Sequence, residues 1–482
     1  MQRRQITRRG MLQTGAAPLL ARSRRDSELL AENQKPGTLA WQLKHYSFDS
    51  GSGSGLRSPR LEGYCSETSV YPGEKVRFLV STEPARKFRL DLYRSGYYGG
   101  TGGRHMAHLG PFSGEPQPVP LMGLERAREC SWHPAAEFEI PSDWPSGVYL
   151  GKLALVDQPV ESYVIFIVKS KRRADLLFQC SDFTWQAYNK WPGWDSLYDD
   201  GTPKRGNAYN YTGPHVRVSF DRPYAQYGQV HEVAQSLGSG EYLLWEHPLS
   251  FWLEKQGFDV IYCSNLDTER DPGLLRQVRV FLSVAHDEYW TRAMYENVWA
   301  ARERGLSLAF LSGNAIRREI TTYKSTVTGA PLRTFARVDR FPNEHLLMGT
   351  HSFGPGYGDW VVANAKHWIF EGTGMKDGDA FEGLVGWEYH GQPADLPGLE
   401  IVAQAPLAPF SREPNAGTFA AVVFPGPKGN WIFNAGTIWW NEALSSPPGH
   451  APAASRLGRP FGPDERAQRI TENFLNRCLR GG

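Results

Sequence analysis

The sequence has only five cysteines among its 482 residues, and they lie far apart in the chain. No two of them have the close spacing of a redox motif or a thiolate metal site, and paired cysteine and histidine zinc patterns are also absent. Cys180 and Cys263 lie inside apolar runs, which predicts buried thiols. The cysteines therefore predict neither a disulfide framework nor a zinc finger.

A strong net charge and long apolar runs are also missing. The 53 Lys and Arg residues nearly balance the 51 Asp and Glu residues, and the formal net charge is +2. Nucleic-acid binding usually needs a clear basic excess, so we expect no nucleic-acid partner. No internal run approaches the ~18 apolar residues of a membrane-spanning helix. The hydrophobic fraction of 40% supports a large core, and the length suits two or three domains.

The N-terminus carries an arginine pair, Arg8-Arg9, within the segment Thr7 to Gln13. A short, weakly apolar stretch of small residues follows before charges resume at Arg22. This order is typical of a twin-arginine export signal, which predicts a periplasmic or secreted protein. We therefore expect residues 1–34 to be an export signal followed by a disordered segment. The alternative interpretation is a disordered basic tail.

Short strands with frequent turns characterise residues 35–170. Residues 75–80, 87–93 and 147–153 alternate between apolar and polar positions, and turn sequences rich in Gly and Pro separate such runs. This pattern predicts an N-terminal β-sandwich domain. The glycine-rich residues 97–103 lack the Lys-Ser/Thr of a phosphate loop, so we interpret them as a connection between strands.

The pattern changes near residue 171, where compact apolar runs begin to alternate with amphipathic segments. We expect strands at residues 174–180, 258–263, 278–284 and 306–311, and helices at residues 241–256, 291–304 and 464–479. Strands that alternate with helices form right-handed βαβ units around a parallel sheet. The sequence therefore predicts an α/β domain over residues 171–482.

Polar side chains follow each of these four predicted strands. In open α/β sheets, ligands bind beyond the carboxyl ends of the strands. The groups delivered there are Tyr188 after the first strand, Asn265 and Asp267 after the second, His286-Asp287-Glu288 after the third, and Asn314 after the fourth. Because four strand ends agree, we expect a functional site at this edge of the sheet.

The densest of these groups is His286-Asp287-Glu288. Three titratable side chains after a buried strand predict desolvation and coupled pKa shifts. His286 suits a general acid or base, Glu288 suits a hard oxygen ligand or a base, and the Asn314 amide suits an oxyanion or a carbonyl. In the alternative interpretation, Glu288 caps the helix that starts near Thr291 and Asp287 is solvated.

The strand-to-helix turn carries no Ser or Cys nucleophile, so metal-activated water is the favoured mechanism. Hard oxygen ligands such as glutamate and tyrosine favour ferric iron, because a strong Lewis acid deprotonates phenol at neutral pH. Zinc or another ion at the same ligands is a further alternative.

Several motifs together resemble the large (beta) subunit of N,N-dimethylformamidase and its relatives. They are Thr184-Trp185-Gln186-Ala187-Tyr188-Asn189, Ser196-Leu197-Tyr198-Asp199, Asp221-Arg222-Pro223-Tyr224, His286-Asp287-Glu288-Tyr289-Trp290, Ser312-Gly313-Asn314 and Gly386-Trp387-Glu388-Tyr389. The resemblance covers roughly residue 174 to the C-terminus, and residues 35–38 and 93–100 resemble the β-sandwich module of the same family. It implies a glutamine-amidotransferase-like α/β domain that lacks the usual cysteine.

The resemblance also implies a mononuclear ferric iron held by two tyrosines and one glutamate. In this sequence the implied metal ligands are Tyr188, Tyr198 and Glu288, with Tyr224 as the rival of Tyr198. The implied catalytic residues are His286, Asn314 and Glu388.

The implied reaction is hydrolysis of a small or secondary amide. The chain is much shorter than the family enzyme and has Asp287 where that enzyme has a proline, so we do not expect dimethylformamide as the natural substrate. The need for a small subunit and the formation of a homo-oligomer stay open. Trp185, Trp191 and Trp194 are either an apolar wall of the site or packing residues. The alternative function is a non-catalytic exported protein that binds a carbohydrate or cell-wall ligand.

Overall fold

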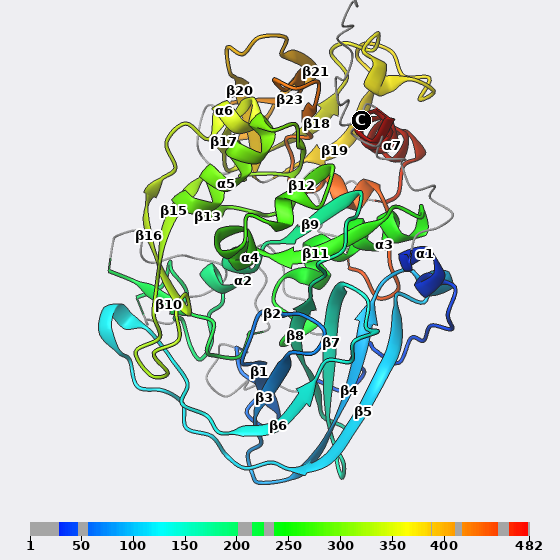
Figure 1. The fold of residues 1–482 in the computed structure, drawn as a ribbon. Coiled ribbons are helices and arrows are strands. Elements are labelled where there is room, and N and C mark those ends of the chain that lie inside the picture. The colour runs from blue at the N-terminus through cyan, green and yellow to red at the C-terminus, as the bar shows by residue number, and fades with distance from the viewer. Residues whose placement is uncertain are drawn as a thin grey trace, which may run out of the picture.

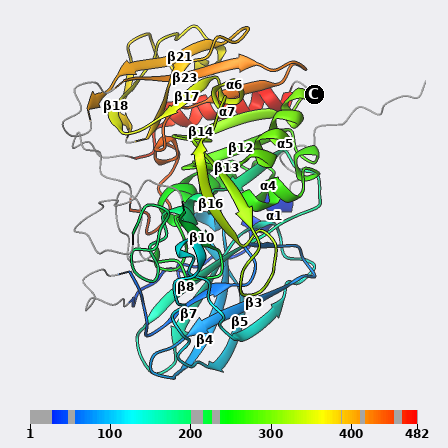
Figure 2. The ribbon, with the colours of Figure 1, turned by 90° about the vertical axis from the view of Figure 1, so that its left-hand side faces the viewer.

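The computed structural model of the protein describes residues 28–46, 56–200, 215–225, 236–386, 388–409, 417–451 and 462–480. The strands of residues 62–168 form one end of the molecule, and the yellow and orange strands of residues 350–425 form the other (Figures 1 and 2). The green βα units of residues 176–312 lie between them. The twin-arginine segment lies outside the described residues, so export stays a prediction.

The N-terminal residues are structured earlier than we expect. Residues Glu28–Asn33 form helix α1, so the prediction of disorder up to residue 34 is wrong at its C-terminal end. Asn33 donates to Glu254 Oε2 over 2.8 Å and accepts from the backbone amides of Tyr97 and Tyr98 over 2.9 and 3.0 Å. These buried bonds fix α1 to the rest of the chain.

Two mostly antiparallel sheets follow. The five-stranded sheet has the order β2 (Ser69–Val70), β8 (Glu161–Val168), β7 (Gly147–Leu155), β4 (Lys87–Ser95), β5 (Gly103–Ser113), and the three-stranded sheet has the order β1 (Glu62–Cys65), β3 (Lys75–Ser81), β6 (Pro134–Glu139). One hydrophobic cluster contains residues of both sheets, among them Phe78 and Phe166, whose ring centroids are 6.1 Å apart. The predicted strands are confirmed individually, while the β-sandwich assignment stays a prediction.

A nine-stranded mixed sheet forms the centre of the molecule. Its order is β11 (Val260–Ser264), β9 (Leu176–Cys180), β12 (Val280–Ala285), β14 (Ser307–Ser312), β24 (Trp431–Asn434), β23 (Thr418–Pro425), β20 (Tyr389–Pro393), β17 (Thr350–Phe353), with β21 (Glu400–Pro406) also paired to β23. The first five strands are parallel and the others antiparallel. The four predicted parallel strands are therefore present, while the glutamine-amidotransferase-like assignment stays a prediction.

Two smaller sheets complete the strands. They are β10 (Arg217–Ser219), β16 (Thr334–Arg340), β15 (Arg318–Tyr323), β13 (Tyr289–Thr291), and β19 (Ala380–Val385), β18 (Gly356–Val361), β22 (Ala408–Pro409), each in spatial order. The α-helices after α1 are α2 (Asp182–Ala187), α3 (His247–Lys255), α4 (Asn265–Arg270), α5 (Arg292–Glu303), α6 (His345–Met348) and α7 (Glu465–Arg480). None of the described helices is long and apolar enough to cross a membrane.

The helix predicted over residues 241–256 differs in its first part. Residues Tyr242–Glu246 form a π-helical turn, η5, and the α-helix α3 begins only at His247. Pro248 has no backbone N–H, so it cannot donate to an earlier turn of a continuous α-helix. The predictions for α5 and α7 agree with the structure to within about a residue at each end.

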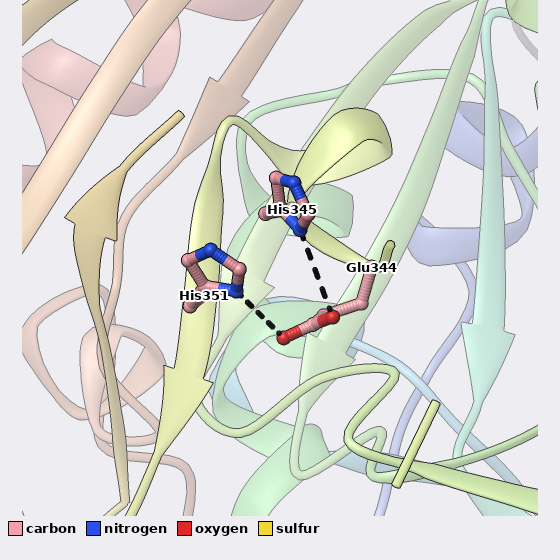
Figure 3. A group of neighbouring side chains, drawn as sticks. All are labelled: Glu344, His345 and His351. Carbon is pink, nitrogen blue, oxygen red and sulfur yellow. Dashed lines mark hydrogen bonds and ion pairs between the residues drawn. The ribbon is translucent and has the colours of Figure 1, made fainter. Parts of the chain in front are cut away.

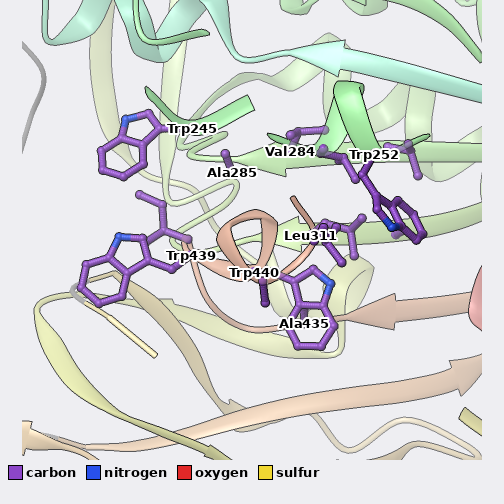
Figure 4. Packing of buried hydrophobic residues seen from close by; sticks show 14 of the residues in the cluster. Trp245, Trp252, Val284, Ala285, Leu311, Ala435, Trp439 and Trp440 are labelled. Atoms are coloured by element: carbon purple, nitrogen blue, oxygen red, sulfur yellow. The ribbon is translucent and has the colours of Figure 1, made fainter. Parts of the chain in front are cut away.

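The parallel strands are covered on both faces. On one face, four buried tryptophans from η5, α3 and the segment after β24 pack toward the ends of β12 and β14 (Figure 4); they are Trp245, Trp252, Trp439 and Trp440. On the other face, residues of α2, α4 and α5 form a second buried cluster. Cys180 and Cys263 are fully buried, as predicted, and burial raises the pKa of both thiols. The strands that position the candidate site are thus packed against buried side chains on both faces.

Candidate functional site

The site is built on the turns that follow two neighbouring parallel strands. Ala285 of β12 pairs with Ser312 of β14, and the chain leaves each strand through a left-handed residue. Ala285 has φ +53°, Asn314 has φ +55° and Ile316 has φ +54°. Such angles are rare outside glycine, and strained residues cluster at functional sites. The turns present His286 to Glu288 next to Asn314.

A buried group of one imidazole and two carboxylates lies at this edge. His286 Nε2 is 3.4 Å from Glu288 Oε2 and also forms an ion pair with Glu388. One ligand atom from each residue lies within 4.8 Å of the others, which is close enough to hold one metal ion. The exposed fractions are 1% for His286, 2% for Glu288 and 9% for Glu388.

The electrostatics of this group follow from its burial. Burial disfavours the imidazolium, but the carboxylates of Glu388 and Glu288 outweigh it and raise the pKa of His286 to about 10. Burial opposes the charge of Glu288 too, yet the hydrogen bond and charge of His286 lower the pKa of Glu288. For Glu388 burial dominates, and its pKa is raised. His286 therefore carries a proton between two carboxyl groups.

Two tyrosines converge on Glu288 from the segment after β9. Tyr188 Oη donates to Glu288 Oε2 over 2.5 Å, and Tyr198 Oη lies 3.4 Å from Glu288 Oε1. The two rings stack with centroids 5.1 Å apart. The ring of Tyr224 instead packs against Trp185 at 6.2 Å. Of the two rivals, Tyr198 is therefore the one that contacts Glu288.

The structure adds two members that the sequence reasoning missed. Tyr289 Oη is hydrogen-bonded to Tyr198 Oη, and Arg318 Nε lies 3.7 Å from Glu288 Oε1. Tyr289 directly follows Glu288 in the motif His286 to Trp290, so the sequence could have predicted that it lies near the site. Arg318 begins β15, and no pattern in the sequence links it to this site. Burial raises the pKa of Tyr198, but the charges of Arg318 and Arg337 act in the opposite direction.

Asp287 is not solvated, so that part of the alternative interpretation is wrong. Its side chain is fully buried and accepts hydrogen bonds from Gln179 over 2.8 Å, Asn265 over 2.9 Å and Ser283 over 2.8 Å. Burial raises the pKa of Asp287 to about 6. The residue connects the end of β12 to β9 and to α4, because Gln179 lies in β9, Asn265 in α4 and Ser283 in β12.

Helix capping does not account for Glu288 either. The side chain of Thr291 accepts the hydrogen bond from Met294 N and caps α5. Asp267, which we expected at the same edge, completes a capping box with Ser264 at the start of α4. The Glu288 side chain is therefore free of a capping role and contributes to the buried group with His286. Asp267 instead stabilises the start of α4.

Asn314 brings an amide that is available for a ligand. Its side chain is 2% exposed, and its Oδ1 has no hydrogen-bond partner among the described residues. A Cβ at Gly313 would lie 2.4 Å from the backbone oxygen of Glu388, so only glycine permits this close approach. Gly313 therefore brings the Asn314 turn against the segment that carries Glu388.

The tyrosine-bearing segment is braced by Arg222. This buried guanidinium donates to the carbonyl oxygens of Trp191 over 2.8 Å, Asp195 over 3.0 Å and Asn189 over 3.0 Å. A fully buried ion pair between Lys190 and Asp199, 2.7 Å long, closes the same segment. These contacts fix the chain between Tyr188 and Tyr198.

The three tryptophans of this segment have packing roles. Trp191 and Trp194 belong to a separate hydrophobic cluster, in which Trp191 and Trp132 have ring centroids 6.0 Å apart. Trp185 donates its Nε1–H to Glu246 over 2.8 Å. These contacts favour the packing interpretation over an apolar wall of the site.

A large surface hollow lies elsewhere. It has a volume of about 1320 Å³ and is lined by residues that precede β12, β14 and β24, among them Arg279, Leu306 and Asn430. It therefore lies at the amino ends of these strands, whereas the cluster lies beyond their carboxyl ends. None of the side chains around Glu288 lines this hollow.

Comparison with known proteins identifies a family. The family described as N,N-dimethylformamidase beta subunit-like, C-terminal, matches residues 89–452. No protein among those of curated function matches the chain. A solved structure found by shape is a family 123 glycoside hydrolase from Clostridium perfringens, with 10% identity, 61% of this chain and 53% of that chain covered, and a TM-score of 0.11. This chain spans about half of that enzyme, and the likeness is too weak to carry an argument.

The matched region begins in β4 and includes every residue of the cluster around Glu288. It covers well over half of the chain, so the resemblance expected from the motifs is confirmed. The chain belongs to the N,N-dimethylformamidase beta subunit-like family.

Proposed function

We propose that the protein is an iron-dependent hydrolase that cleaves the C–N bond of a small or secondary amide after export by the twin-arginine pathway. The observation that carries the proposal is the convergence of the Tyr188 and Tyr198 phenol groups on the Glu288 carboxylate. Membership of the family supports amide hydrolysis as the reaction class.

The donor set fits a hard cation. Bonds of about 2.1 Å hold neighbouring ligands of an octahedral ion about 3 Å apart. The two separations from phenol oxygen to carboxylate oxygen, 2.5 and 3.4 Å, bracket that value. Burial and the charge of Glu288 raise the pKa of both phenols, and a bound cation reverses this by stabilising phenolate. Only a strongly acidic ion does so readily, which favours ferric iron over zinc.

When bound, the ion supplies Lewis acidity for the amide carbonyl oxygen. In the proposed reaction, the oxygen of water adds to the carbonyl carbon and the C–N bond then breaks. Glu388 takes the proton from water, and the pair of Glu388 and His286 returns it to the departing amine nitrogen. Asn314 donates from its NH₂ to the carbonyl oxygen, and its amide oxygen, which has no hydrogen-bond partner among the described residues, can accept from the N–H of a secondary amide.

The test compares two buried glutamates. Glu288→Ala removes a proposed ligand, whereas Glu161→Ala removes a carboxylate that pairs with Lys152 over 2.9 Å in the N-terminal sheets. Both proteins are produced with added iron and measured for iron content, visible absorption and amine release from formamides and acetamides. We expect Glu288→Ala to lose iron, colour and activity, and Glu161→Ala to keep all three.

Two outcomes would contradict the proposal. An unmodified protein that folds, lacks iron and colour, and releases no amine would favour the non-catalytic binding alternative. A colourless protein that hydrolyses amides with zinc would keep the reaction but exclude ferric iron.

A further inference from the structure

A second group of side chains suited to a metal lies away from Glu288. Glu344, His345 and His351 each offer one ligand atom within 4.8 Å of the others, and we refer to them as the Glu344 cluster. The first two residues lie at the start of α6, and His351 lies in β17. Figure 3 shows both imidazole rings turned toward the carboxylate.

Of two separations within the Glu344 cluster, the shorter matches the spacing of ligand atoms around one tetrahedral ion and the longer exceeds it. Zinc bonds of about 2.0–2.1 Å place tetrahedral ligand atoms about 3.3 Å from one another. His351 Nδ1 is 3.2 Å from Glu344 Oε1, and His345 Nδ1 is 3.9 Å from Glu344 Oε2. The two carboxylate oxygens thus face different rings, whose centroids are 4.0 Å apart.

One ring nitrogen of the Glu344 cluster makes no hydrogen bond to the described residues. His345 Nδ1 is buried and has no hydrogen-bond partner in the described part of the chain. Its 3.9 Å distance to Glu344 is too long for a hydrogen bond. A buried polar atom without such a partner is costly, and a ligand at this point would satisfy it.

The exposure of the cluster suits an ion that keeps a water ligand. The Glu344 side chain is 3% exposed, while those of His345 and His351 are 23% and 30% exposed. A buried anion beneath two half-buried imidazoles leaves the outer side open. Arg340, which is 45% exposed, donates to Glu344 Oε1 over 3.1 Å and competes for the same carboxylate.

The cluster is connected to the turn that carries Asn314. Ser352 N donates to Glu344 Oε1 over 3.4 Å, and the Ser352 hydroxyl group donates to the carbonyl oxygen of Ala315. An ion bound by Glu344 and His351 would therefore hold β17 against the residue that follows Asn314.

We propose that the Glu344 cluster binds one divalent cation of the zinc class and thereby holds β17 and α6 together. Two nitrogen donors and one carboxylate oxygen form a donor set typical of zinc, with water as the fourth ligand. The site is separate in donor chemistry from the oxygen-rich group around Glu288, and the inference does not depend on the proposed amide hydrolysis.

The test is a calorimetric titration of the full chain with Zn²⁺ in a Glu288→Ala background, so that the first site does not contribute. We expect one equivalent of Zn²⁺ to bind and to raise the melting temperature. His345→Ala with His351→Ala should weaken the Kd at least about 100-fold, since loss of even an outer partner of a metal ligand costs 10–100-fold. Arg340→Ala should strengthen binding, because it removes the competing cation.

The matched control is His105→Ala with His108→Ala, which removes two exposed histidines beside Asp91 in the N-terminal sheet. This variant should bind Zn²⁺ unchanged. An unaltered Kd in His345→Ala with His351→Ala, or no Zn²⁺ binding in the Glu288→Ala background despite a normal melting curve, would overturn the inference. If Glu288→Ala does not fold, the titration is carried out in the double variant Tyr188→Phe with Tyr198→Phe.

Iron content measures the group around Glu288 separately from the zinc titration. Failure of one proposal can therefore be distinguished from failure of the other.

Discussion

The group around Glu288 and the Glu344 cluster differ in donor atoms and in burial. The first combines phenol and carboxylate oxygens, and none of its proposed ligands is more than 7% exposed. The second combines two imidazole nitrogens with one carboxylate, and its histidines are half-buried. Hard oxygen donors in a desolvated position favour a strongly acidic ion, whereas mixed donors near the surface favour a borderline ion. One chain therefore offers two chemically distinct environments to metal ions.

Substitution of the two tyrosines should produce the largest difference between the two groups, because it removes ligands from the group around Glu288 only. Tyr188→Phe and Tyr198→Phe each remove a phenol oxygen that contacts Glu288, so we expect iron affinity to fall at least about 100-fold and the colour to fade. Visible absorption and iron analysis measure this. Tyr224→Phe is the matched control and should leave both unchanged. Loss of colour in Tyr224→Phe instead would reverse the assignment of the second tyrosine.

The next effect concerns Asn314. Removing its amide should lower kcat about 100-fold, the usual scale for one oxyanion-stabilising donor, with iron content unchanged. Because the residue has φ +55°, Asn314→Ala also adds backbone strain. Asn314→Gly removes the amide without that strain. Equal kcat losses in the two variants would locate the effect in the amide, while full activity in Asn314→Gly would contradict the role.

A smaller effect is expected from Arg222, which braces only the oxygen-rich site. Arg222→Lys keeps the charge but cannot reach the three backbone carbonyl groups, so we expect a loss of about 2 kcal/mol in the free energy of unfolding and weaker iron binding. Zinc binding at the Glu344 cluster should not change. The control is Arg292→Lys, which alters an exposed pair with Glu319 and should cost at most about 0.5 kcal/mol.

The smallest effect is a pH dependence from His390, which lies between the two sites. Its Nε2 accepts from Ala315 N over 2.9 Å and its Nδ1 donates to Asn434 Oδ1 over 2.7 Å, so the ring must be neutral. Burial lowers the pKa of His390 to about 4. Because the unfolded chain binds this proton more tightly, stability present above pH ~6.5 is lost as the pH falls toward ~4.

Between pH 7 and pH 5 this residue should account for about 2 kcal/mol of lost unfolding free energy. His390→Gln keeps one donor and one acceptor without titrating, so the difference between the two proteins isolates the effect of His390 from that of the carboxylates. Denaturant unfolding at the two pH values measures it. Equal pH dependence in both proteins would show that the imidazole is not held neutral.

Much of the candidate site was predictable because it lies at strand ends. The apolar runs locate β9, β11, β12 and β14, and the rule for the carboxyl ends of parallel strands then selects Tyr188, His286, Glu288 and Asn314. Glu388 was different, because it precedes the antiparallel strand β20 and only the family resemblance pointed to it.

The parts that were not predictable depend on long-range contacts. Arg318 reaches Glu288 because β15 pairs with β13, a parallel contact that no local pattern signals. The cap of α5 fell to Thr291 and not to Glu288, since the two residues are close enough in sequence for either role. The histidines of the Glu344 cluster lie on either side of the turn between α6 and β17, and their approach depends on how that turn folds.

The change from parallel to antiparallel pairing at β24 has a consequence for maturation. Glu288 follows β12 in the parallel part of the sheet, and Glu388 precedes β20 in the antiparallel part. The two parts meet where β14 pairs with β24, and roughly a hundred or more residues separate these two strands in the sequence. Such non-local pairing closes late in folding because of its entropic cost. We therefore expect the ion pair between His286 and Glu388 to form only after the C-terminal strands have joined the sheet. A newly made chain would have a complete metal-binding group only from that point.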